Sequence, residues 1–156
     1  MKFRATPDIV ADFLSGKRFA VAGVSRNPQK LGNALMRRLR DSGYEVVPLN
    51  PHAATLEGVP CYPDLAAVPG EIDGLVVATS PGATLSLVEQ CARRGVRRVW
   101  FHRGIGKMSG SEKAVSRAKA LGLKCIAGGC PFMYCGRVDP FHKCLRAWTQ
   151  WVRPLD

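Results

Sequence analysis

The chain has 156 residues, of which 46% are hydrophobic and 22% charged, and its formal net charge is +11. This length and composition predict one globular domain with an ordinary core rather than a disordered chain. All apolar runs are too short to span a membrane and residues 1–16 lack the pattern of a secretory signal, so we expect a cytoplasmic protein whose six cysteines are reduced.

The basic excess indicates affinity for an anionic partner, but charge alone does not identify it. The arginines and lysines are spread over several predicted helices, and no helix-turn-helix, zinc-finger or RNA-binding aromatic motif accompanies them. The sequence therefore does not favour nucleic acid as a partner. A small ligand with several phosphates would use the same charge, and the loops described next bear on that alternative.

The N-terminal part of the chain has a pattern typical of a nucleotide-binding unit. Residues 8–14 predict a short amphipathic helix, and the apolar run at 19–24 predicts a strand buried on both faces. A polar loop follows, and from Leu31 the apolar residues recur at helical spacing. In a βαβ unit the amides of such a loop and the N-terminus of the helix point at a phosphate. The residues predicted to bind in this loop are Gly23, Val24, Ser25, Arg26, Asn27 and Lys30.

This loop differs from a dinucleotide fingerprint, which would read G-x-G-x-x-G. After Gly23 the next glycine is Gly32, so the loop alone is equally compatible with a plain turn between a strand and a helix. Residues 44–49 predict the second strand, which ends in Asn50 and Pro51. An NAD-binding unit would have an acidic residue here to bind the ribose, so Asn50 argues against ordinary NAD binding.

Three further apolar runs predict the remaining strands, at residues 74–79, 98–102 and 123–127. Single amphipathic helices separate them, whereas 53–72 is irregular with one short helical turn at 64–67. The predicted fold is α/β: a Rossmann-like, doubly wound, five-stranded parallel sheet with an N-terminal helix and a C-terminal helical tail. We expect a single domain with its core at about 17–131 and a helical extension at about 136–153.

Every distinctive loop falls at the carboxyl end of a predicted strand, which is where open parallel sheets bind their ligands. Besides the two loops above, these loops contain Thr79, Ser80 and Pro81, then Arg103 and Gly104, and finally Gly128, Gly129 and Cys130. This coincidence favours the interpretation of the first loop as part of a site for a nucleotide-like ligand over its interpretation as a plain turn.

Candidate catalytic groups are sparse. The spacing of Cys130, Cys135, His142 and Cys144 matches no zinc signature, so packed or free thiols are the simpler interpretation. The histidines have no serine, cysteine or carboxylate partner at motif spacing, and paired carboxylates are absent. The pattern indicates binding rather than chemistry, and we predict no catalytic residue and no metal.

The C-terminal tail departs from the alternation of strands and helices. Residues 140–152 predict a helix in which Phe141, Leu145 and Trp148 form an apolar stripe. Packing against the core is the simpler role for this stripe, and the alternative is a contact between the two subunits of a homodimer.

The loops resemble those of the CoA-binding domain at the N-terminus of the succinyl-CoA synthetase α subunit and of ADP-forming acyl-CoA synthetases. The chain is most similar to small stand-alone members of that family, over about residues 18–131. The motifs that carry the resemblance are Gly23-Val24-Ser25, Leu49-Asn50-Pro51, Thr79-Ser80-Pro81, His102-Arg103-Gly104-Ile105 and Gly129-Cys130-Pro131. The resemblance implies a Rossmann-like sheet with CoA across the strand ends. The first loop would hold the phosphates, and the loops after the second to fourth strands would hold the nucleotide and the pantetheine arm.

This resemblance implies coenzyme A or an acyl-CoA as the ligand. The ligases also carry a second domain with a phosphorylated histidine, for which this chain has no room, so we expect non-catalytic binding. The alternative is an NAD(P)-dependent oxidoreductase or another dinucleotide-using enzyme, which Asn50 disfavours for NAD but not for NADP. Cys130 would either lie within reach of the pantetheine thiol or pack as a small apolar residue.

Overall fold

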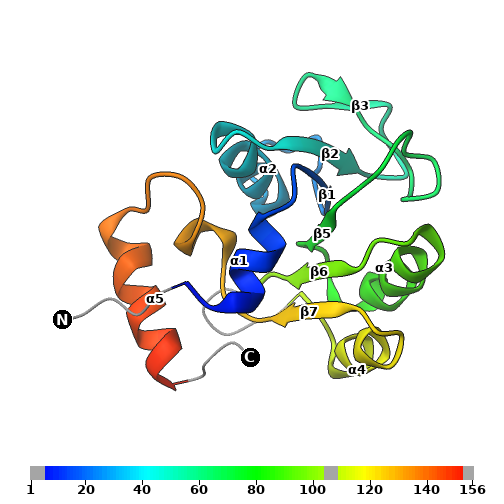
Figure 1. Cartoon of the computed structure of the whole chain (residues 1–156). Helices are drawn as coiled ribbons and strands as arrows, with labels where there is room; N and C mark the ends of the chain where they lie inside the picture. The colour runs from blue at the N-terminus through cyan, green and yellow to red at the C-terminus, as the bar shows by residue number, and fades with distance from the viewer. Residues whose placement is uncertain (1–5, 104–108, 153–156) are drawn as a thin grey trace.

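The computed structural model describes residues 6–103 and 109–152, which form a parallel sheet flanked by helices (Figure 1). The sheet strands are β1 (Arg18–Ala22), β2 (Glu45–Leu49), β5 (Gly74–Val77), β6 (Arg98–Phe101) and β7 (Lys124–Ala127). Their order is β2-β1-β5-β6-β7, and every neighbouring pair is parallel. This confirms the predicted doubly wound, Rossmann-like fold, in which the strand order reverses between β1 and β5.

As the sequence predicts, helices connect the sheet strands except between β2 and β5. They are α1 (Asp8–Leu14), α2 (Leu31–Asp41), α3 (Pro81–Arg94), α4 (Glu112–Ala120), the short 3-10 helix η1 (Pro131–Met133) and α5 (Pro140–Val152). Gly95 ends α3 with a φ of 76°, and the Ser111 hydroxyl caps α4 by accepting the N–H of Ala114. No helix in the described part of the chain is long and apolar enough to cross a membrane.

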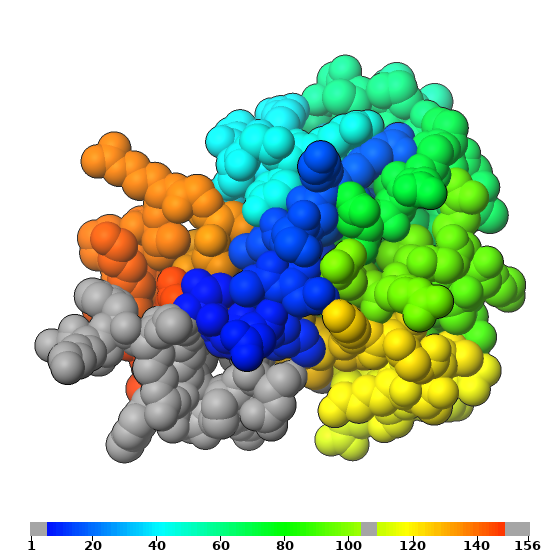
Figure 2. All heavy atoms as spheres, in the orientation of Figure 1, coloured from blue at the N-terminus to red at the C-terminus, as the bar shows by residue number. Residues whose placement is uncertain are grey.

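Helices cover both faces of the sheet because its strands are apolar on both sides. Phe19 and Val21 of β1 pack with α1 and α2, whereas the alternate residues of that strand pack with α3 and α4. Phe13 of α1 stacks on Phe19 at 4.8 Å and meets Trp100 edge-on at 5.3 Å. Figure 2 shows α1, in blue, between the C-terminal segment and α4. The N-terminal helix therefore closes the core on its face of the sheet.

The carboxyl ends of the five strands lie in register. Ala22 pairs with Leu49 of β2 and with Val77 of β5, and this row continues to Phe101 of β6 and Ala127 of β7. The loops that leave these residues therefore start side by side along one edge of the sheet, which we call the carboxyl edge. All the candidate ligand loops predicted from the sequence begin there.

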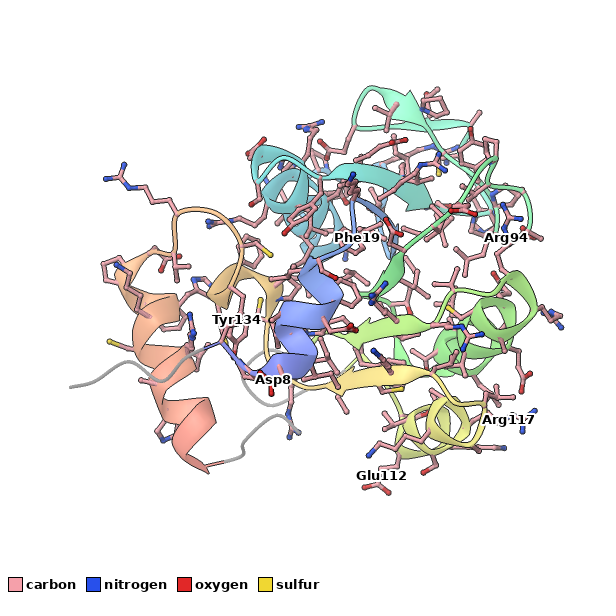
Figure 3. All side chains as sticks on the ribbon, viewed as in Figure 1. Asp8, Phe19, Arg94, Glu112, Arg117 and Tyr134 are labelled. Carbon is pink, nitrogen blue, oxygen red and sulfur yellow. The ribbon has the colours of Figure 1, made fainter. Side chains whose placement is uncertain are left out.

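The opposite, amino edge is held by polar contacts. The Asp73 carboxylate accepts the backbone N–H groups of Lys17 and Arg18 at 2.7 and 2.9 Å, which ties the start of β1 to the start of β5. Arg94 and Arg117, in the last turns of α3 and α4, lie on the same side of the sheet (Figure 3). Basic residues at helix C-termini compensate the helix dipole, which accounts for part of the positive charge.

Residues 53–72 differ from the sequence-based expectation. They contain a hairpin of β3 (Thr55–Leu56) and β4 (Val59–Pro60), whose two-residue strands are too short to produce an alternating pattern. A turn replaces the helical turn expected at 64–67, and there the Asp64 carboxylate accepts the N–H of Ala67 at 2.9 Å. The structure therefore adds a small hairpin next to β2.

Candidate functional site

The first loop crosses the point where the strand order reverses. Gly23, directly after β1, has a φ of 104°, a conformation that favours glycine. A Cβ atom at Gly23 would lie 2.6 Å from the carbonyl oxygen of Ala78, the residue after β5. The loop backbone thus runs against the end of β5 with no side chain between them. In open α/β sheets the ligand crevice lies at this reversal.

Gly32 brings the N-terminus of α2 against the same loop. A Cβ atom at Gly32 would lie 2.2 Å from the carbonyl oxygen of Gly23, so only glycine allows the helix to approach this closely. The N–H groups of the next two residues donate to the Lys30 carbonyl, which leaves those of Leu31 and Gly32 without an acceptor among residues 6–103 and 109–152. Free N–H groups at a helix N-terminus carry partial positive charge and suit a phosphate.

The turn that precedes α2 is ordered by its own hydrogen bonds. The Ser25 hydroxyl accepts the N–H of Asn27 at 3.0 Å, and the Asn27 side-chain oxygen accepts the N–H of Gln29 at 3.0 Å. The N–H of Lys30 then donates to the Asn27 carbonyl at 3.2 Å. The loop is therefore shaped before any ligand arrives, which lowers the entropy cost of binding.

Asn33, a polar residue on the buried face of α2, fixes the start of this loop. Its side chain, 1% exposed, accepts the N–H of Ser25 at 2.9 Å and donates to the Ser25 carbonyl at 2.8 Å. The same amide nitrogen donates to Glu57, in the turn between β3 and β4, at 2.8 Å. Sequence reasoning finds neither Asn33 nor Glu57. The available signal is a lone asparagine among the apolar positions of a predicted helix, which must be hydrogen-bonded once buried.

The second loop is joined to the first through Asn50. Its side-chain nitrogen donates to the Val24 carbonyl at 2.9 Å, and its side-chain oxygen accepts the N–H of His52 at 2.8 Å. Arg26 also donates to the carbonyl oxygen of His52, so two contacts link the loops after β1 and β2. Pro51, the residue between Asn50 and His52, is exposed. Asn50 thus organises backbone at the position where an NAD-binding unit presents an acid to the ribose.

Two exposed cations stand on the first loop. Lys30 is the residue that precedes α2, so its side chain starts beside the free N–H groups of the helix. Arg26 has further N–H donors besides the one that contacts His52. The Val24 side chain is 1% exposed and belongs to the core, so this residue offers only its backbone to the loop. The helix N-terminus and the two cations together give this loop a positive character that suits a phosphate.

The third loop leads from β5 into α3. Ser80 precedes the helix and Pro81 is its first residue, a position that suits proline because no N–H is needed there. The Ser80 side chain makes no capping bond. The Thr79 hydroxyl is buried and has no hydrogen-bond partner within the described ranges. A second helix N-terminus therefore lies beside the end of β5.

The loops after β6 and β7 meet each other. The N–H of Arg103 donates to the Gly129 carbonyl at 3.0 Å, and the N–H of His102 donates to Val77 at 3.0 Å. Burial lowers the pKa of His102 to about 4, so its imidazole is neutral at physiological pH. Arg103 is half-buried, and Gly104, also predicted as a site residue, lies outside the described residues.

The Cys130 side chain packs into the core beside α1 and α2 and is 5% exposed. Burial raises the pKa of its thiol to about 11, so little of the thiolate needed for disulfide exchange is present. The six cysteines are free, and within the described ranges no group of histidine, cysteine and acidic residues could hold a metal ion. The packing is consistent with a structural role for the sulfur, and contact between Cys130 and a ligand stays a prediction.

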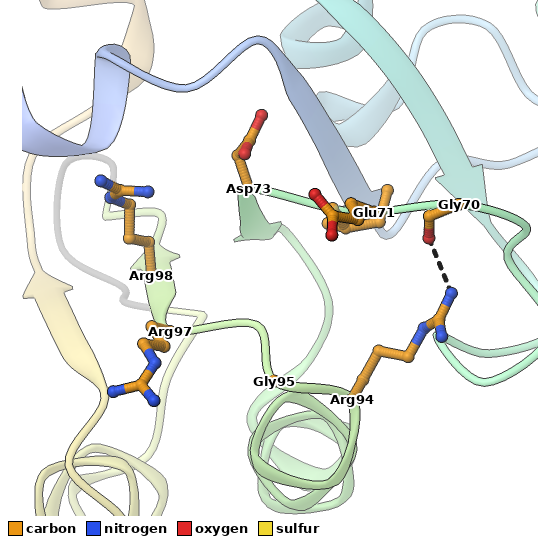
Figure 4. Close-up of a pocket in the computed structure, with 8 residues that line it drawn as sticks. Gly70, Glu71, Asp73, Arg94, Gly95, Arg97 and Arg98 are labelled. Atoms are coloured by element: carbon orange, nitrogen blue, oxygen red, sulfur yellow. Dashed lines mark hydrogen bonds between the residues drawn. The ribbon is translucent and has the colours of Figure 1, made fainter.

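A separate pocket of about 410 Å³ lies at the amino edge, between the segment before β5 and the end of α3 (Figure 4). Two of its arginines already have partners: Arg94 donates to the Gly70 carbonyl at 2.7 Å, and Arg98 donates to Asp12 at 2.9 Å. Arg97 points away from the acidic side chains of the opposite wall. These arginines stabilise the packing of α1 and α3, so we regard the pocket as a feature of the fold and not as a candidate ligand site.

Comparison with known proteins identifies relatives of this architecture. The chain is 29% identical over 120 residues to acetate–CoA ligase (ADP-forming) I of Archaeoglobus fulgidus, a match that covers 73% of this chain and 18% of the ligase. The chain therefore spans less than a fifth of that relative's length. Among solved structures, a hypothetical protein of Pyrococcus horikoshii shares 30% identity and a TM-score of 0.71, with 79% of this chain and 84% of that chain covered.

A dinucleotide-forming acetyl-coenzyme A synthetase 1 of Candidatus Korarchaeum cryptofilum, in complex with phosphate and ADP, superposes with a TM-score of 0.63 at 29% identity. That match covers 72% of this chain and 25% of the synthetase. The family model described as the CoA binding domain matches residues 17–135, which include all five sheet strands and every loop of the carboxyl edge. The chain belongs to the CoA-binding domain family.

Proposed function

We propose that this protein binds coenzyme A or an acyl-CoA at the carboxyl edge and catalyses no reaction on it. One observation carries most weight: Gly23 and Gly32 bring the first loop, the end of β5 and the N-terminus of α2 together where the strand order reverses. That arrangement leaves the N–H groups of Leu31 and Gly32 without acceptors in the described part of the chain. A diphosphate would satisfy them. Membership of the CoA-binding domain family supports CoA as the molecule that carries it.

In this proposal the CoA phosphates lie at the N-terminus of α2, with Arg26 and Lys30 as their cationic partners. The nucleotide and the pantetheine arm extend along the next loops, where Thr79 has an unsatisfied hydroxyl and Arg103 is half-buried. The match to the ligase covers 18% of that enzyme, so ligase activity is not part of the proposal. Asn50 is bonded to backbone on both sides, which supports CoA over NAD.

Titration calorimetry with CoA, acetyl-CoA, NAD and NADP tests this proposal directly. We expect the CoA compounds to bind more tightly than either dinucleotide. Native mass spectrometry of the freshly purified protein supplies an independent check, since a CoA-sized ligand can be retained through purification. NAD or NADP affinity equal to or above that of CoA would contradict the proposal and support the oxidoreductase alternative.

Single substitutions locate the phosphates. Arg26→Ala or Lys30→Ala should weaken CoA binding by about 1.5–3 kcal/mol, the usual worth of a charge-assisted hydrogen bond to a desolvated phosphate. Lys119→Ala, which removes an exposed lysine in the last turn of α4 and so on the side away from the carboxyl edge, is the matched control for loss of one positive charge. Equal effects at all three positions would mean that the overall charge, and not the first loop, attracts the ligand.

A further inference from the structure

Glu57 occupies a backbone conformation that its residue type disfavours. It has a φ of 52°, and it is the one non-glycine residue with a positive φ among residues 6–103 and 109–152. Gly58, which follows it, has a φ of 78°, so the two residues form the tight turn between β3 and β4. Such turns favour glycine or asparagine at the position of Glu57. A strained residue of this kind persists where its side chain has a task.

The Glu57 side chain reaches from the hairpin to α2. Its Oε1 atom accepts a hydrogen bond from Asn33 at 2.8 Å and one from Arg37 at 2.7 Å. The bond from Asn33 is the largest cause that lowers the pKa of this carboxyl, followed by the contact with Arg37. The carboxylate is therefore charged at neutral pH and is an effective acceptor for both donors.

Asn33 transmits this contact to the first loop. With one N–H of its amide directed to Glu57, the other N–H reaches the Ser25 carbonyl at 2.8 Å and the oxygen accepts the Ser25 N–H at 2.9 Å. The orientation of the buried amide thus fixes both polar groups of the Ser25 backbone. Ser25 in turn begins the turn that leads to the free N–H groups of α2.

We propose that Glu57 is a positioning residue, which holds the first loop in its binding shape through Asn33; this role rests on the proposed function. Arg37 is a second link, because it donates both to Glu57 and to the Pro28 carbonyl of the first loop. Glu57 contacts the loop only through α2, so its effect on a ligand is indirect. The competing explanation is that the carboxylate merely anchors the hairpin to α2. That explanation predicts changes in stability that are independent of ligand affinity.

Three variants separate these explanations. Glu57→Gly removes the acceptor. It also relieves the backbone strain of the positive φ, which offsets part of the stability that is lost with the two hydrogen bonds. Glu57→Gln keeps an oxygen for Asn33 while it removes the charge. Arg40→Met removes a contact that anchors the hairpin to α2 without touching the first loop, the hydrogen bond from Arg40 to the Glu57 carbonyl at 3.4 Å. Arg37 does not suit this control, because it also donates to the Pro28 carbonyl of the first loop at 2.8 Å.

Two measurements apply to each variant: the CoA dissociation constant by calorimetry, and the exchange rate of the Ser25 amide hydrogen by NMR in the unliganded protein. For Glu57→Gly we expect about a ten-fold weaker affinity for CoA, equivalent to 1.4 kcal/mol, and faster exchange at Ser25. Arg40→Met should stay within about two-fold of wild type, under 0.5 kcal/mol, for CoA affinity, and Glu57→Gln should fall between Arg40→Met and Glu57→Gly because it keeps the acceptor oxygen but loses the charge.

Wild-type affinity or wild-type Ser25 exchange in Glu57→Gly would overturn the inference. Losses of equal size in Arg40→Met would also overturn it, because they would show that anchoring the hairpin to α2 is what matters. If the wild-type protein does not bind CoA, the proposed function fails by itself. The exchange rate at Ser25 then still decides whether Glu57 orders the loop.

Discussion

Arg98 of β6 donates to one oxygen of Asp12 in α1 at 2.9 Å, and Lys124 of β7 donates to the other oxygen at 3.1 Å. One carboxylate thus ties the N-terminal helix to two strands at the amino edge. The hydrogen bond from Arg98, and after it the one from Lys124, lowers the pKa of Asp12 from 3.8 to about 2.

Asp12 should make the fold sensitive to acid. Because its folded pKa lies below the unfolded value of 3.8, its stabilising contribution is present above pH 4 and is lost as the pH falls toward 2. Asp12→Asn should cost about 1 kcal/mol at neutral pH, since the pair is partly exposed, and little at pH 2. Urea unfolding at several pH values measures this, with Asp41→Asn at the exposed end of α2 as control. An unchanged acid slope in Asp12→Asn would contradict the prediction.

His102 should produce a second loss of stability, at higher pH. Burial lowers its folded pKa to about 4 from 6.5, so the unfolded chain takes up the proton first as the pH falls. The contribution of His102 to the free energy of unfolding is therefore complete above pH 6.5, and it declines by up to about 3 kcal/mol as the pH falls toward 4. His102→Gln should remove this slope, and His52→Gln, at an exposed site, should retain it. The free energy of unfolding between pH 7 and pH 4 decides between these outcomes.

Gly32→Ala should damage both the fold and the site. The new Cβ would meet the Gly23 carbonyl at 2.2 Å, so the helix must move, at a cost of about 2 kcal/mol or more, and CoA binding should weaken with it. Gly82→Ala, in the first turn of α3, is the matched control because a Cβ there meets nothing within 4 Å. That variant should be neutral or gain up to about 1 kcal/mol. A Gly32→Ala protein as stable as wild type would refute the close approach.

Cysteine reactivity distinguishes a packed thiol from one at the ligand. Cys144 is exposed, whereas Cys130 is buried with a thiol pKa raised to about 11. After incubation with CoA disulfide, intact mass should show one adduct that is absent from Cys144→Ser and present in Cys130→Ser. An adduct that disappears with Cys130→Ser would instead place that sulfur beside the pantetheine thiol.

Deletion of residues 140–156 should lower the melting temperature. Leu145 packs against the core beside η1, and the Phe132 and His142 rings lie 5.3 Å apart, so the deletion removes contacts within the chain. Phe141 and Trp148 are each 59% exposed on the same helix. The double change Phe141→Ser and Trp148→Ser should therefore leave the melting temperature nearly unchanged. Light scattering of that variant tests the homodimer: a halved particle mass would establish it, and an equal mass assigns α5 to packing alone.

The strands were predictable because each is buried on both faces and is therefore a continuous apolar run. The run at 74–79 contains β5, and the run at 98–102 contains β6. Glycines and prolines mark the boundaries, as Gly95 and Pro81 do for α3. The hairpin at 55–60 was not predictable, since two residues in each strand give no period.

The place of the candidate site was predictable, but its internal organisation was not. The loops could be assigned to one edge because parallel strands end together. The link from Glu57 to Asn33 joins residues 24 positions apart through side chains, and no local pattern encodes it. Gly32 was visible in the sequence, but its role depends on how closely α2 crosses the first loop.

The position of β1 between β2 and β5 also constrains how the protein folds. The backbone of Arg18 is bonded to Asp73, 55 residues further along the chain. Closing a loop of this length costs conformational entropy before any native contact forms to offset the loss, so such distant pairing slows folding. During synthesis, the Gly23 loop can take its final shape only after Ala78 has left the ribosome, because its backbone is set against that residue. The shape of this loop consequently depends on a residue made 55 positions later, although the loop itself is among the first parts of the carboxyl edge to be made.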